Sequence, residues 1–132
     1  MLSLISVRFI LIAAALHGFA AVALGAFGAH ALRARFEDGA EGLKAQGWWT
    51  TATQYQLTHA VALFALAAWC ARAPSALGSA AGLTFTLGSL VFSGTLYAMA
   101  LGAPRWLGAI TPIGGLLLLA GWACVLVMAA KQ

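Results

Sequence analysis

The sequence contains little charge, and acidic residues are almost missing from it. Only 8% of its 132 residues are charged, and its three acids, Glu37, Asp38 and Glu41, stand close together. Soluble domains carry about 25% charged residues, so this composition excludes an ordinary soluble protein. A proton pump that relays protons between carboxylates inside a membrane has no residue to use, because no acid lies in the apolar parts of the chain.

Cysteine is scarce as well, and the sequence lacks the common metal and haem motifs. Cys70 and Cys124 have apolar neighbours, which is typical of small hydrophobic side chains rather than of ligands. There is no C-x-x-C, C-x-x-C-H or H-E-x-x-H sequence. His17 and His59 would allow a bis-histidine haem, but their estimated depths in a membrane differ by about 7 Å. We therefore expect no metal ion and no cofactor.

What the chain does contain is four long runs with almost no charge, at residues 9–32, 50–71, 75–103 and 106–130. A helix needs about 20 apolar residues to cross a bilayer, and each run is long enough. Lipid offers no partners to backbone N–H and C=O groups, so such segments must be helical. We predict an all-α integral membrane four-helix bundle, a single transmembrane domain over residues 1–132 with spans at approximately 9–32, 50–71, 77–101 and 110–130.

The basic residues occupy positions that suit a membrane surface. The net charge is +4, and the cations lie at the ends of the runs or between them: Arg8, Arg33, Arg35, Lys44, Arg72, Arg105 and Lys131. There they reach lipid headgroups, so we expect the lipid bilayer and not nucleic acid as the partner. Their distribution does not decide the orientation by the positive-inside rule; we favour cytoplasmic termini. A cleavable signal peptide that ends at Ala29-His30-Ala31 is an alternative interpretation of the first run, but that run is longer than the roughly 7–15 apolar residues usual in such signals.

The connection at residues 33–49 is the least apolar segment, and two interpretations of it stay open. Its apolar residues recur near helical spacing and end in the pair Trp48-Trp49, which suits the headgroup region. It could form a short interfacial helix between the first two spans. Three glycines equally favour a loop that is anchored by the tryptophans.

Further along the chain, Thr111 and Pro112 have the residue types of a helix N-cap and first turn, so we expect the last helix to begin at Pro112.

Small and polar residues follow helical spacing inside the expected spans. Such stripes let membrane helices approach closely, and we assign a packing role to Gly25, Gly28, Gly82, Ser89, Gly114 and Gly115. A candidate polar site consists of His59, Tyr55, Gln56, Tyr97, Ser93 and Thr111, with His17 and His30 as secondary candidates. Ionisable residues at membrane depth are functional candidates. A neutral histidine that bonds a serine or a carbonyl group would be purely structural, and both interpretations stay open.

Several segments resemble one family of small membrane proteins. They are residues 25–32, 49–56 with His59-Ala60, 94–97 and 105–115. The chain resembles the domain of unknown function 423, which is grouped with the eukaryotic transmembrane protein 256. The resemblance implies a four-helix inner-membrane protein of bacterial type without an established activity. It implies signature positions, to which it gives no role, at Gly28, His30, Gln54, Tyr55, His59, Tyr97, Thr111, Pro112 and Gly115.

Three functional hypotheses follow. The first is an accessory or interaction subunit that forms a homo-oligomer or docks on a larger membrane complex through its small-residue stripes. The second is a component of a small-solute or lipid transporter or channel, with a polar site around His59 and Tyr97. The third is a membrane enzyme or cofactor-binding redox subunit that uses His59, His17 or both. No supported catalytic motif is present, so we expect that the protein is not an enzyme.

Overall fold

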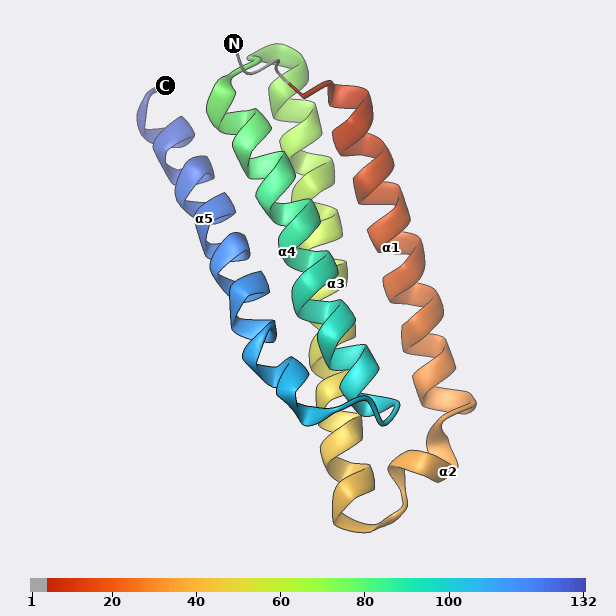
Figure 1. Ribbon diagram of the computed structural model, residues 1–132. Helices are drawn as coiled ribbons and strands as arrows, with labels where there is room; N and C mark the ends of the chain where they lie inside the picture. The colour runs from red at the N-terminus through yellow and green to blue at the C-terminus, as the bar shows by residue number, and fades with distance from the viewer. Residues whose placement is uncertain (1–4) are drawn as a thin grey trace.

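The computed structural model describes residues 5–132 as a set of helices (Figure 1). Residues 1–4 of the predicted domain lie outside the described part. The elements are α1 (Val7–His30), α2 (Arg33–Phe36), α3 (Gly39–Arg72), α4 (Ala76–Ala100), the 3-10 helix η1 (Arg105–Ala109) and α5 (Thr111–Ala130). No strand occurs among residues 5–132, so the predicted all-α class is confirmed.

Three helical segments are long and apolar enough to cross a membrane. They are α1, α4 and the segment Arg105–Ala130, which contains α5. The prediction of membrane-crossing helices is therefore confirmed for three segments. The second expected span, residues 50–71, lies within α3, whose apolar character is weakened by Thr50, Thr51, Gln54, Gln56 and Thr58.

Serine side chains define where two of these helices begin. The Oγ atoms of Ser6 and Ser75 accept hydrogen bonds from the backbone N–H groups three residues further on, at 3.1 Å and 3.0 Å. A cap of this kind stabilises a helix by about 1 kcal/mol. The expectation that Thr111 caps the last helix is wrong by one position. Thr111 is already helical, and its hydroxyl donates to the carbonyl group of Leu107 at 3.2 Å.

The connection between α1 and α3 differs from both interpretations of residues 33–49. It contains the four-residue helix α2, and from Gly39 the chain continues as one helix of 34 residues, which is about 51 Å long. Residues 39–49 are thus the first turns of α3 and not a separate helix. Gly42 makes this possible, because a Cβ there would lie 2.6 Å from the carbonyl oxygen of Arg35 in α2. Beside it, Arg33 donates to Glu37 at 2.8 Å, and this bond raises the pKa of the Arg33 guanidinium.

The long helices pack in chain order, and both termini lie at the same end (Figure 1). Helix α1 packs on α3, α3 on α4 and α4 on α5, whereas α1 makes few contacts with α4, and the backbones of α3 and α5 do not approach each other. This arrangement leaves two grooves. The α1–α4 groove has α3 as its floor, and the α3–α5 groove lies on the other side of the molecule with α4 as its floor.

Close helix contacts depend on small residues, although not on all of those expected. A Cβ on Gly114 would overlap the backbone of Phe92, and one on Gly28 would overlap the indole ring of Trp49. A Cβ on Gly82 would lie 3.1 Å from Ile10, and Ser89 is fully buried. Gly115 has only ordinary contact with a ring at 3.8 Å, and a Cβ on Gly25 would meet nothing within 4 Å. Within one chain, therefore, Gly25 is not needed for packing.

Candidate functional site

A chain of three polar side chains joins three helices on the α1–α4 side. The hydroxyl group of Tyr97 donates to Oε1 of Gln56 at 2.8 Å, and Nε2 of Gln56 lies 3.1 Å from Nδ1 of His17. Because Oε1 faces the tyrosine, Nε2 faces the histidine, and an amide nitrogen can only donate. Nδ1 of His17 is therefore the acceptor, and the ring is neutral with its proton on Nε2. The network links α1, α3 and α4 without a charge.

His59 lies on the other side of the molecule, and both of its ring nitrogens have partners. Nδ1 is 2.7 Å from the backbone oxygen of Tyr55, to which it donates, and the indole N–H of Trp122 donates to Nε2 at 3.1 Å. These two bonds assign the neutral Nδ1–H tautomer. The ring also packs between Phe85 and Trp122, with ring centroids 5.4 Å and 6.0 Å away. His59 thus links α3 to α5, two helices whose backbones do not meet.

The predicted polar site is therefore divided among separate places. His59 and Tyr55 face the α3–α5 groove, whereas Gln56 and Tyr97 belong to the network with His17. The hydroxyl of Ser93 donates to the backbone oxygen of Ala52 at 2.8 Å, and Thr111 pairs with Thr95 at 2.7 Å. His30 is exposed at the end of α1. The structure does not bring the six predicted side chains together.

Two residues that take part in these contacts are not among the candidates predicted from the sequence. His17, a secondary candidate, is bonded directly to Gln56, while Trp122 and Thr95 were not considered. Trp122 carried a usable signal: it lies in the middle of the last apolar run, far from the headgroup region where tryptophan usually collects. An indole N–H at that depth needs an acceptor within the protein.

Each of the two buried histidines borders an apolar groove on the side of the bundle. The α1–α4 groove has a volume of about 550 Å³ and is lined mostly by α1, including Phe9, Ile12, Leu16 and His17. The α3–α5 groove has a volume of about 580 Å³ and is lined by Tyr55, His59, Phe92, Leu116 and Trp122 among others. Their walls are mainly hydrocarbon, so each is suited to an acyl chain or an apolar side chain.

The outer face of α3 is different, because it combines polar and apolar side chains that no residue between 5 and 132 covers. We define this face as Gln54, Leu57, Thr58 and Val61, all of which are exposed. Neither Gln54 nor Thr58 forms a side-chain hydrogen bond with any residue between 5 and 132. A shallow cavity of about 340 Å³ joins this face to Tyr55 and His59.

The described residues gather no obvious reactive centre. Among residues 5–132, no three side chains of the types His, Cys, Asp and Glu lie together in a way that could hold a metal ion. Cys70 and Cys124 are both free thiols. The two buried histidines are held by hydrogen bonds that protonation would break, so the arrangement supports a structural role for both.

Comparison with known proteins shows what the chain is similar to. The family model described as "Protein of unknown function (DUF423)" matches residues 24–115. The chain is 42% identical over 124 residues to the UPF0382 inner membrane protein YgdD of Escherichia coli K12, covering 94% of this chain and 91% of the relative. It is 38% identical over 123 residues to the UPF0382 membrane protein YwdK of Bacillus subtilis, covering 92% of this chain and 95% of that one. No solved structure matches.

Proposed function

The chain belongs to the DUF423 family, and from this premise we propose that it is an interaction subunit of the inner membrane. In this proposal it is a bundle of four spanning helices, and it associates with a second copy through the outer face of α3. Family membership confirms the resemblance recognised in the sequence. The location in a bacterial inner membrane also agrees with the names of the relatives.

Helix α3 serves as the fourth span in this proposal. It packs against α1 and against α4, and both of these are apolar enough to cross the bilayer. A helix held between two spans lies in the same layer of lipid. The part of α3 between Trp49 and Arg72 covers about 34 Å at 1.5 Å per residue, which matches the hydrocarbon core. The earlier turns of α3 then lie beyond the hydrocarbon core.

The observation that carries the proposal is the polarity of a surface that would otherwise face lipid. Gln54 and Thr58 are exposed on consecutive turns of α3, and burying an unpaired amide or hydroxyl in hydrocarbon costs about 2–7 kcal/mol. Covering them with another helix that supplies hydrogen bonds removes this cost. Amide and hydroxyl groups both donate and accept, so the same surface on a second copy is complementary to this one across a twofold axis.

The proposal is tested by the oligomeric state in lipid nanodiscs, measured by native mass spectrometry. The variant Gln54→Leu with Thr58→Val keeps the side chains close in size and removes their hydrogen bonds, so we expect monomers where the unchanged protein forms dimers. Gln46→Leu is the matched control, because Gln46 is exposed on the same helix before Trp49 and should leave the dimer intact. A monomeric unchanged protein, or a dimer that survives the double substitution, would overturn self-association by this face.

The other two functional hypotheses have less support. A transport site around His59 and Tyr97 requires these residues to share a cavity, yet they border different sides of α3 and α4. A redox subunit requires histidine nitrogens that are free to bind a cofactor, whereas His59 uses both of its own. The absence of a catalytic role stays a prediction. The cytoplasmic position of the termini stays a prediction.

A further inference from the structure

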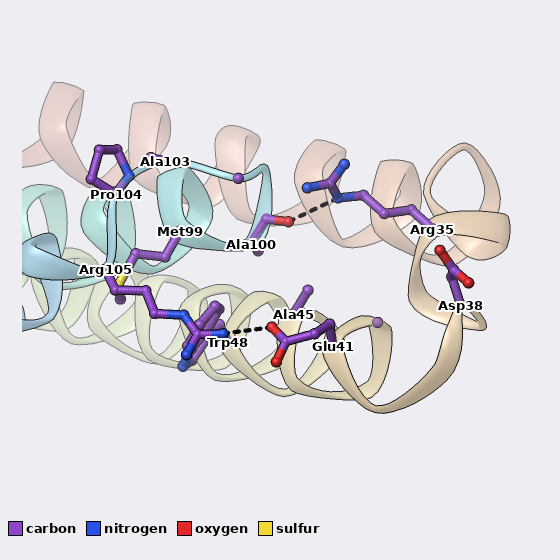
Figure 2. Close-up of a pocket in the computed structure, with 12 residues that line it drawn as sticks. Arg35, Asp38, Glu41, Ala45, Trp48, Met99, Ala100, Ala103, Pro104 and Arg105 are labelled. Carbon is purple, nitrogen blue, oxygen red and sulfur yellow. Dashed lines mark hydrogen bonds and ion pairs between the residues drawn. The ribbon is translucent and has the colours of Figure 1, made fainter.

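A charged cavity lies at the end of the molecule opposite the termini, outside the two membrane grooves. Its volume is about 430 Å³, and it is enclosed by α2, the first turns of α3 and the loop between α4 and η1. Figure 2 shows Arg35 and Asp38 at one end of this cavity and the pair Arg105–Glu41 along another side. Trp48, Met99 and Pro104 supply apolar wall. The cavity therefore combines charge of both signs with an apolar lining.

Two glycines with left-handed backbone conformation lie in the wall of this cavity or directly beside it. Gly39, directly after Asp38, has φ +64°, and Gly102, in the loop after α4, has φ +99°. Other residues rarely adopt such angles. A Cβ on Gly102 would also lie 3.2 Å from Nη2 of Arg35. The absence of a side chain there leaves the end of the guanidinium group accessible from the cavity.

Of the four charged side chains in the cavity, two neutralise each other. Arg105 and Glu41 form an ion pair at 2.6 Å. Arg35 is oriented by a hydrogen bond from its Nε to the backbone oxygen of Ala100 at 3.0 Å, but its terminal Nη groups donate to no residue in the described part of the chain. The carboxylate of Asp38 likewise forms no hydrogen bond or ion pair within residues 5–132.

One oriented cation and one free anion in a single cavity are complementary to a ligand that also carries both charges. A guanidinium group binds phosphate through paired N–H donors, and a carboxylate binds a primary ammonium group. The apolar wall near Trp48 and the position directly beyond the membrane spans place such a ligand at the lipid surface, where phosphate groups of phospholipids lie.

We infer that this cavity binds a phosphoethanolamine group, with its phosphate on Arg35 and its ammonium group on Asp38. The group has two sources, the headgroup of a phospholipid and a small soluble phosphodiester, which present the same chemistry to the cavity. The inference does not depend on self-association through α3, because no residue of the cavity belongs to the outer face of that helix.

The test measures which lipids the purified protein retains in nanodiscs that contain equal amounts of phosphatidylethanolamine, phosphatidylcholine and phosphatidylglycerol. We expect selective retention of phosphatidylethanolamine. Arg35→Gln should weaken this retention by about tenfold or more, since it removes a charge-assisted interaction. Asp38→Asn should abolish the preference over phosphatidylglycerol, which has no ammonium group.

Neighbouring residues provide matched controls. Arg33→Gln and Glu37→Gln make the same charge changes in or next to α2, but these two residues pair with each other at the surface and should not alter retention. Thermal unfolding checks that each variant is folded.

Adding soluble glycerophosphoethanolamine separates the two sources of the phosphoethanolamine group. Displacement of the lipid means that the headgroup alone suffices, and failure to displace it means that the lipid is the ligand. Equal retention of all three lipids, or no effect of both Arg35→Gln and Asp38→Asn, would overturn the inference.

Discussion

Two serines on one face of α4 permit a sharp test of how hydrogen bonds stabilise this bundle. Ser89 and Ser93 are one turn apart, and both are 0% exposed. The Ser93 hydroxyl donates to the backbone oxygen of Ala52 across the α3–α4 contact, whereas the Ser89 hydroxyl has no partner among the described residues. Replacing each with alanine removes the same atom from equally buried positions.

The two substitutions should change the free energy of unfolding in different directions. Ser93→Ala removes a hydrogen bond between membrane helices, and such bonds are worth about 0.6 kcal/mol on average. Ser89→Ala removes a buried hydroxyl without a partner, whose desolvation costs about 1–3 kcal/mol. Because both changes have the same effect on helix propensity, that contribution cancels when the two variants are compared. We expect Ser89→Ala to be more stable than Ser93→Ala by about 1 kcal/mol or more.

Unfolding in mixed micelles of a mild detergent and dodecyl sulfate, followed by circular dichroism, measures this difference. The unchanged protein should fall between the two variants. The reasoning fails if Ser89→Ala destabilises the protein as much as Ser93→Ala does. That result would mean that the two hydroxyls have equivalent surroundings and that the α3–α4 contact differs from the one described.

Two further predictions concern packing and the polar network. Gly114→Leu should destabilise the protein by about 3 kcal/mol or more, since its side chain would overlap the backbone of α4. The control Gly94→Ala should not destabilise it, since nothing lies within 4 Å of the added atom and alanine is favoured over glycine inside a helix by up to about 1 kcal/mol. Gln56→Leu should cost about 2–4 kcal/mol in the same unfolding assay, because it leaves the buried His17 and the half-buried Tyr97 without these hydrogen bonds. A cost no larger than that of Ser93→Ala would contradict the network.

Hydropathy alone predicted most of the helical layout, because lipid leaves a spanning chain few alternatives to a helix. It did not predict that α3 begins at Gly39. Glycines at positions 39, 42 and 47 argue locally against a helix, and what favours it is contact with α2, where Gly42 has no side chain to interfere. Such a contact depends on the path of the preceding turn, which no periodicity in the sequence reveals.

The candidate site was predicted less well, for a geometric reason. Tyr55 and Gln56 are adjacent in the sequence, but adjacent residues on a helix point about 100° apart. Tyr55 consequently borders the α3–α5 groove, and Gln56 bonds to residues of α1 and α4. Which side chains meet depends on the order in which the helices pack. The sequence predicted four helices but not that α1 and α5 would lie at opposite edges.

Cysteine cross-linking in native membranes tests whether two copies associate through the outer face of α3. Val61 is 64% exposed on this face, one turn beyond Thr58, and Leu16 is 65% exposed on α1. In a background where the two native cysteines are replaced by alanine, Val61→Cys should form cross-linked dimers, and Leu16→Cys should not. Absence of a dimer with Val61→Cys, or equal cross-linking at both positions, would contradict the account.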